Sequence, residues 1–102
     1  MEINNLKDAA GWFSVLQTDK QAQTAVMKLA PGSWSGEKGN EHPESLQILM
    51  VVEGEVIAEI GDERNVLHAG DVVLVEPGAE HRFGNETRAS ALTFNVYVPP
   101  AY

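Results

Sequence analysis

Short apolar segments separated by glycine and proline turns are the feature that most restricts how this chain can fold. Within these segments, apolar and polar side chains tend to alternate with a period of two, as on the two faces of a half-buried strand. No stretch shows the periodicity of an amphipathic helix. The predicted strands are residues 11–16, 21–29, 46–52, 55–60, 64–67, 72–75, 81–83 and 89–98. The pattern predicts a single all-β domain over residues 1–102, built as a sandwich or barrel.

The stretch 40–54 joins a polar cluster to the strongest apolar run of the chain. A barrel strand has this pattern when a polar site lies at its mouth. His42 and Gln47 are five positions apart, so an unbroken strand would point them to opposite faces. We therefore expect a bend or bulge at residues 43–45 that lets both side chains face the interior. Both faces of the run are apolar, which predicts a strand covered on both sides.

Composition and charge exclude several functional classes. The chain has 15 acidic and 7 basic residues and a net charge of -8, and its basic residues are scattered. Phosphate binding needs clustered Lys and Arg, so nucleic acid is not an expected partner. Cysteine is absent, which excludes disulfides, zinc ribbons and thiol catalysis. The first residues do not resemble a secretory signal, and the longest apolar run is too short to span a bilayer. We expect a cytoplasmic protein that does not enter membranes.

Residues 34–54 match the first of two motifs of a known family. That motif runs Gly, His-x-His, Glu and a closing Gly. Alignment on Gly54 places Gln47 at the Glu position and His42 at the second His position. Asn40 then falls where the first His would stand.

Residues 70–85 match the second motif more closely. Its pattern is Gly, five residues, Pro-x-Gly, two residues, His, three residues, Asn. The glycines, His81 and Asn85 fall in place, and Pro77 is shifted by one position. With these two motifs the chain resembles the cupins, which are small jelly-roll barrels of the double-stranded β-helix type.

The resemblance implies a divalent metal at the mouth of the barrel. In cupins the motif histidines and the glutamate bind the metal, so the corresponding ligands here are His42, Gln47 and His81. Asn40 stands in the fourth position, and Glu44 is an alternative source of oxygen. Imidazole suits Zn, Ni, Fe or Mn, whereas an amide oxygen is a weaker, uncharged ligand. The alternative interpretation is that the two histidines are hydrogen-bonded residues of the barrel interior and hold no metal.

Other residues near the predicted site have less defined roles. We expect Met50, Phe83 and Phe94 to form pocket walls that exclude water. Glu37, Glu41 and Glu44 are general-base candidates or solvated surface residues. We expect His68 on the surface and Arg82 to point away from the cavity. Trp34, in a polar loop, either covers an edge of the core or lines a ligand pocket.

Two functional hypotheses follow. The first is a metal-dependent enzyme, of the oxygenase or isomerase type, that acts on a small polar substrate. The second is a non-catalytic module that binds a small molecule, with or without metal, and a scaffold with a relic pocket is a third, structural alternative. The family resemblance also implies a homodimer, for which the apolar segments 12–13 and 97–102 are candidate contacts.

Overall fold

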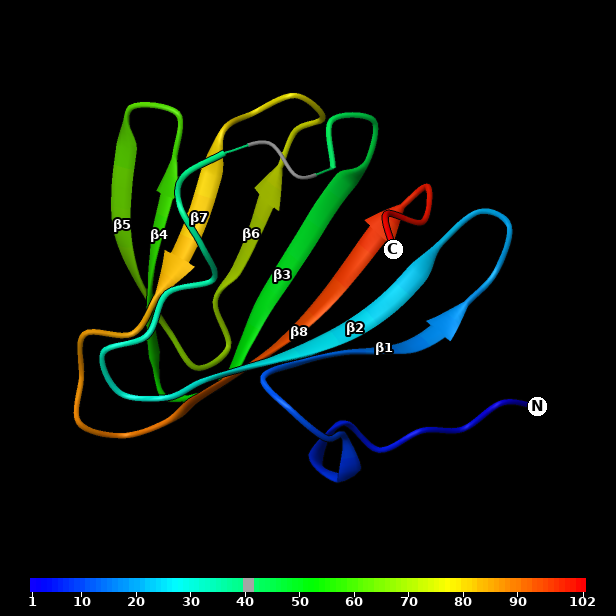
Figure 1. Ribbon diagram of the computed structural model, residues 1–102, viewed down its shortest axis with the longest axis horizontal. Helices are drawn as coiled ribbons and strands as arrows, with labels where there is room; N and C mark the ends of the chain where they lie inside the picture. Colours follow the sequence, from blue (N-terminus) through cyan, green and yellow to red (C-terminus); the bar gives the residue numbers. More distant parts are fainter. Residues whose placement is uncertain (40–41) are drawn as a thin grey trace.

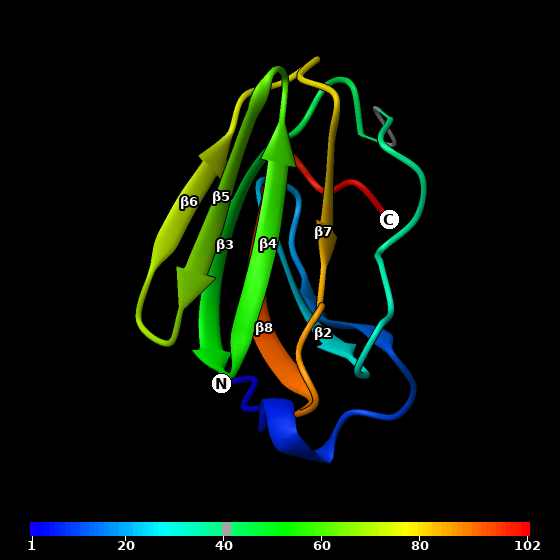
Figure 2. The same ribbon diagram turned by 90° about the vertical axis from the view of Figure 1, so that its left-hand side faces the viewer.

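In the computed structural model, which describes residues 1–39 and 42–102, the chain folds into two facing β-sheets (Figures 1 and 2). The strands of the described part are β1 (Phe13–Thr18), β2 (Gln23–Leu29), β3 (Leu46–Glu53), β4 (Glu55–Ile60), β5 (Glu63–His68), β6 (Val72–Val75), β7 (His81–Gly84) and β8 (Ala91–Val98). The larger sheet has the order β1-β2-β8-β3-β6 and the smaller one β5-β4-β7, and every strand pair is antiparallel. The prediction of an all-β domain is confirmed. No helix of the described residues is long and apolar enough to cross a membrane.

Alternation places the core between the sheets. On β2 the inward residues Ala25, Met27 and Leu29 are buried, and Val26 on the opposite face is buried as well. On β3 the residues that share a face with Gln47 are Leu49 and Val51, both fully buried. The core cluster consists of Met27, Leu29, Leu49, Val51, Val56, Ala58, Val75, Phe83 and Ala91. These residues come from both sheets and form a single shared core.

β8 turns its polar face toward the interior. We had expected its apolar face, with Phe94, to point there. Thr93 and Asn95 are fully buried, while Phe94 lies on the outer face of the large sheet. Phe94 pairs there with Met50 of β3. Neither Met50 nor Phe94 therefore forms a wall of the interior pocket, which corrects our expectation. The polar face tolerates burial because every buried side-chain nitrogen and oxygen in the described residues has a hydrogen-bond partner.

Trp34 covers an edge of the small sheet. Its ring lies so close to Gly84 that a Cβ there would approach ring atoms to 2.2 Å, so only glycine fits. The Arg82 guanidinium stacks 4.2 Å from the centre of the Trp34 ring and donates to Glu59 Oε1 at 2.8 Å. This hydrogen bond lowers the pKa of Glu59, which also pairs with Arg64. Arg82 thus points away from the interior, as predicted.

Candidate functional site

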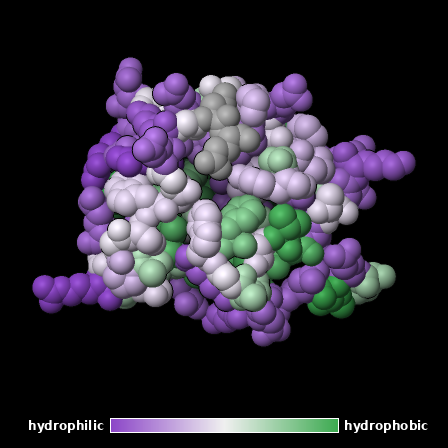
Figure 3. Space-filling view, viewed as in Figure 1, coloured by the Kyte–Doolittle hydropathy of each residue, from purple (hydrophilic) through white to green (hydrophobic). Residues whose placement is uncertain are grey.

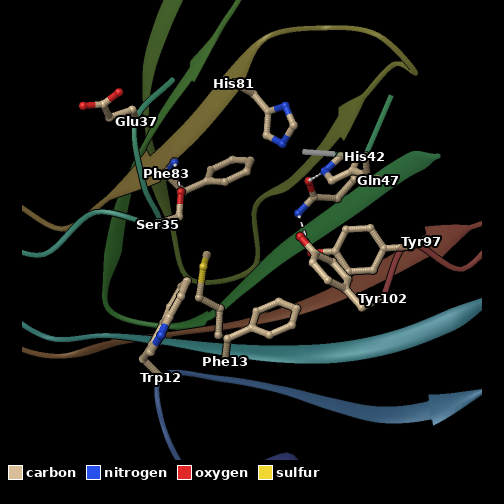
Figure 4. A pocket seen from close by; sticks show the side chains of 11 residues that line it. Trp12, Phe13, Ser35, Glu37, His42, Gln47, His81, Phe83, Tyr97 and Tyr102 are labelled. Carbon is tan, nitrogen blue, oxygen red and sulfur yellow. Dashed lines mark hydrogen bonds between the residues drawn. The ribbon is translucent and has the colours of Figure 1, made fainter. Parts of the chain in front are cut away.

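A cavity between the two sheets collects side chains from β1, β2, β3, β7 and β8 and from the loops (Figure 4). Its lining residues are Trp12, Phe13, Met27, Ser35, Glu37, His42, Gln47, His81, Phe83, Tyr97 and Tyr102. About 40 Å³ is open to the centres of water molecules. This is room for a few ordered waters, or for one ion with its waters. On the face shown in Figure 3, hydrophobic residues gather near the centre and hydrophilic residues occupy most of the periphery.

His42 and Gln47 meet in this cavity because the chain turns between them. The Ser45 amide donates to the His42 carbonyl at 3.1 Å, which closes a turn before β3 begins. The predicted bend at residues 43–45 is confirmed. His42 Nε2 lies 2.9 Å from Gln47 Oε1, and both side chains are buried. Two residues five positions apart therefore face the same interior.

A hydrogen-bonded row of polar side chains extends from Gln47 into the core. The Gln47 amide nitrogen donates to Asn95 Oδ1 at 3.1 Å and approaches the Tyr97 hydroxyl at 3.4 Å. The Asn95 amide in turn donates to Thr93 Oγ1 at 3.0 Å. All of these side chains are at most 3% exposed. The row holds the orientation of the Gln47 amide and keeps its oxygen directed at His42.

His81 completes the polar end of the cavity from the opposite sheet. Its ring centre lies 4.5 Å from that of His42 (Figure 4). His81 Nδ1 lies 2.8 Å from the Ala79 carbonyl oxygen, and a proton on Nδ1 makes this a hydrogen bond. His42 Nδ1 faces the Ser45 carbonyl oxygen at 3.3 Å. A proton on His42 Nε2 makes the 2.9 Å contact with Gln47 Oε1 a hydrogen bond, whereas a proton on Nδ1 leaves the Nε2 lone pair available to a metal ion.

The remaining predicted site residues are distributed differently. Asn40 and Glu41 lie outside the described residues. Glu44 is exposed and lies beside residues 99–101, away from the cavity lining, whereas Phe83 lines the cavity as expected. Glu37 lines the mouth and is exposed. Among the described residues, no three His, Cys, Asp or Glu side chains form a group that could hold a metal.

Several aromatic residues of the cavity did not emerge from the sequence pattern. Trp12 and Phe13 stand at the start of β1, and Tyr97 and Tyr102 come from the opposite end of the chain. The sequence contains a usable signal for Tyr97. It is two residues from Asn95, which is two residues from Thr93, so all three side chains lie on the same face of the strand. The others converge only through the tertiary fold.

The second motif has a structural part as well as a site residue. Asn85 is fully buried, and its amide nitrogen donates to the Leu29 and Ala89 carbonyl oxygens at 2.9 and 2.8 Å. Asn85 Oδ1 accepts from the Thr87 amide and hydroxyl. This asparagine therefore anchors the corner after β7, and His81 is the motif residue that reaches the cavity.

His68 lies on the surface, as predicted. Its Nε2 is 2.9 Å from Glu55 Oε1 on the neighbouring strand β4. The third histidine of the chain is therefore separate from the cavity and serves below as a control position.

Comparison with known proteins agrees with this architecture. The family model described as "Cupin domain" matches residues 25–97. The chain therefore belongs to the cupin domain family. It is 28% identical over 96 residues to the uncharacterized protein YdbB of Bacillus subtilis, across 93% of this chain and 77% of that protein.

Solved structures show the same fold. The protein TT1209 from Thermus thermophilus is similar with a TM-score of 0.83 and 28% identity, across 97% of this chain and 98% of that one. An uncharacterized conserved protein with a double-stranded β-helix domain from Klebsiella pneumoniae has a TM-score of 0.84 and 22% identity, across 98% and 92% of the two chains. The predicted double-stranded β-helix barrel is confirmed.

Proposed function

We propose that this cupin binds a divalent transition metal with His42, His81 and Gln47, and that the metal-containing pocket takes a small polar ligand. The observation that carries the proposal is the convergence of the two histidines and the amide oxygen at one end of a buried cavity. Zn, Ni, Fe and Mn are the candidate metals, because imidazole nitrogen suits all of them.

The geometry of the donor atoms fits such an ion. Two ligand atoms about 2.1 Å from one metal ion would be about 3 Å apart in an octahedral site and about 3.4 Å apart in a tetrahedral site. The separation of His42 Nε2 and Gln47 Oε1 is 2.9 Å. Both imidazoles have a backbone carbonyl oxygen beside Nδ1, the arrangement that orients metal-binding histidines. Asn95 and Tyr97 hold the Gln47 amide in place in the same way.

The protein residues around these donors define what the site can do. A bound divalent metal would act as a Lewis acid and polarise an oxygen of the ligand. Phe13, Phe83 and Met27 form apolar walls that limit the water in the cavity. Tyr97, whose hydroxyl lies beside Gln47, is placed to exchange a hydrogen bond with a ligand oxygen.

Elemental analysis of protein purified without chelator tests the metal proposal. After incubation with Zn²⁺, Ni²⁺, Fe²⁺ or Mn²⁺ and gel filtration, we expect nearly one metal ion per chain for at least one of them. His42→Ala and His81→Ala each remove one of three ligands and should lose the metal, whereas His68→Ala on the surface should retain it. Wild-type protein that stays metal-free with all four ions would contradict the proposal, and so would equal loss from the His68 control.

A non-catalytic ligand-binding module is the second candidate function. The observation that favours it is the shortage of proton-transfer groups: Glu37 is the carboxylate of the described cavity lining, and it is exposed. A binding module needs the cavity and its donors but no acid and base pair. Incubation of the protein with a small hydroxy or keto compound distinguishes the two functions. A catalyst converts the compound over time. A binding module only shifts the melting temperature with the same compound.

We also propose that the protein is a homodimer, through a surface that shares only Val98 with the segments 12–13 and 97–102. Tyr97 is buried and Phe13 lines the cavity, so these side chains are already occupied. The outer face of the large sheet instead presents a continuous apolar grid, here called the outer patch. Its residues are Leu46, Ile48, Met50, Val72, Leu74, Phe94, Val96 and Val98, paired across β6, β3 and β8.

The outer patch is suited to a second copy of the same chain. A two-fold interface brings the same surface of both copies together, so a surface with a net charge of one sign repels itself. In a chain with a net charge of -8, the outer patch contains no charged residue. Val72 and Leu74 are 61% and 49% exposed, although a solvated sheet face normally alternates to polar residues.

Sedimentation velocity tests the dimer. We expect wild-type protein to sediment as a dimer at micromolar concentration and Val72→Asp to shift it to monomer, because the interface would bury two unpaired carboxylates. Val66→Asp is the matched control, since Val66 is a valine of β5 that is 50% exposed outside the outer patch. A wild-type monomer, or equal effects of both substitutions, would contradict this assignment.

A further inference from the structure

We propose that residues 99–102 form a strap that closes the cavity, with Tyr102 as a removable wall and Gln23 as its latch. The strap follows β8 and belongs to neither sheet. It turns back beside the large sheet, near the end of β8 and the start of β2 (Figure 1). Its closure rests on geometry alone, and its role in selecting a ligand rests on the proposed function.

The Gln23 side chain holds the far end of the strap. Its Oε1 accepts from the amides of Ala101 and Tyr102 at 3.1 and 2.9 Å, and its Nε2 donates to the Tyr102 carbonyl oxygen at 2.7 Å. Nε2 also donates to Thr18 Oγ1 at 3.1 Å. Three of the four hydrogen bonds of this amide therefore go to two strap residues. Gln23 is only 1% exposed, so breaking these bonds requires water to enter.

The near end of the strap is held by Ser45. Its hydroxyl donates to the Pro99 carbonyl oxygen at 2.7 Å, and the serine is 3% exposed. The strap is thus attached at both ends by side chains rather than by a sheet ladder. Its detachment from Gln23 would break no strand pair, so the strap can open locally while both sheets stay intact.

The Tyr102 ring is the part of the strap that lines the cavity. Its ring centre lies 4.8 Å from that of Phe13 and 5.1 Å from that of Tyr97, and Figure 4 shows it beside Tyr97. Tyr102 is itself 53% exposed, so one side of this wall faces solvent. Residues 99–101 and His42 also line a second pocket, on the surface of the protein. Because the strap lines both pockets that reach His42, its movement would expose more of this side chain.

The closed strap limits the size of the ligand that the cavity can hold. With the strap in place, about 40 Å³ is open to the centres of water molecules, which suits an ion with a few waters. A larger ligand gains room beside Tyr97 when the Tyr102 ring moves away. Tyr102 is therefore a specificity-determining residue of the pocket, and Gln23 controls how often the wall opens.

Chemical modification of histidine by diethyl pyrocarbonate, mapped by peptide mass spectrometry, tests the strap. EDTA is present throughout, so the result does not depend on metal binding. In wild-type protein we expect slow reaction of His42, which is 5% exposed, and fast reaction of the exposed His68. Tyr102→Ala should raise the rate at His42 about tenfold and leave His68 unchanged, because only local opening is affected.

Matched variants separate closure from loss of structure. Tyr102→Phe retains the ring and should react like wild type. Gln23→Leu removes the latch at similar volume and should raise both the His42 rate and the exchange rates of the Ala101 and Tyr102 amides. Gln21→Leu, on the exposed turn before β2, should change neither. Circular dichroism confirms that each variant is folded. Fast reaction of wild-type His42, or an unchanged His42 rate in folded Tyr102→Ala, would overturn the proposal even if metal binds as proposed.

Discussion

Replacement of Phe83 by alanine is expected to lower the free energy of unfolding by about 3–5 kcal/mol. Phe83 is 2% exposed and belongs to the core cluster between the sheets. Truncation removes its packing and leaves a hole that joins the existing cavity, so the surrounding strands can relax only in part. Because domains of this size are stable by about 5–15 kcal/mol, the variant should be close to the limit of folding.

Urea unfolding followed by circular dichroism measures this loss. Phe83→Leu is the graded control, since it retains most of the apolar volume and should cost less than half as much as alanine. Val66→Ala on the outer surface of β5 should cost little, because Val66 is half-exposed. A loss below about 1 kcal/mol for Phe83→Ala would show that Phe83 is not part of a tightly packed core.

Gln47→Glu is expected to tighten Zn²⁺ binding by roughly 10- to 100-fold. The substitution exchanges a neutral amide oxygen for a carboxylate oxygen of nearly the same position and size. Two imidazoles and an amide leave the charge of the metal uncompensated, and a carboxylate neutralises part of it in a buried site. Calorimetric titration of chelator-treated protein with Zn²⁺ measures the change.

The same substitution should weaken the metal-free protein. Gln47 Nε2 donates to Asn95 Oδ1, and a carboxylate has no proton to replace that bond. We expect a loss of about 1–3 kcal/mol without metal that Zn²⁺ more than restores. Gln47→Leu is the control, because it removes the ligand atom and should abolish binding. Equal Zn²⁺ affinity in wild type and both variants would show that Gln47 is not a ligand.

The local pattern predicted most of the strands and part of the site. β6 was predicted with its observed bounds, and the bend at residues 43–45 followed from the odd spacing of His42 and Gln47. These features depend on neighbouring residues: alternation marks a strand, and glycine or proline ends it. His42 and His81 reach one cavity because their motif positions lie at the same end of the two sheets.

The orientation of β8 shows where local reasoning fails. Alternation divides the strand into a polar and an apolar face, and the usual rule turns the apolar face inward. Here Asn95 and Thr93 point inward because Gln47, on a neighbouring strand, provides hydrogen bonds that offset the cost of their burial. The apolar face, with Phe94, then becomes part of the outer patch. The deciding partner lies 48 positions away, so the sequence of β8 contains no sign of it.

By itself the sequence determined that this protein is an all-β chain with a cupin pair of motifs, because strands, turns and motif spacing are local properties. The tertiary structure alone decided which face of β8 is inside and which aromatic residues enclose the cavity. Phe13, Tyr97 and Tyr102 come from opposite ends of the chain and meet only when β2 has paired with both β1 and β8. Contacts between distant segments depend on the packing of the whole domain, since their energy appears only after the two sheets have come together.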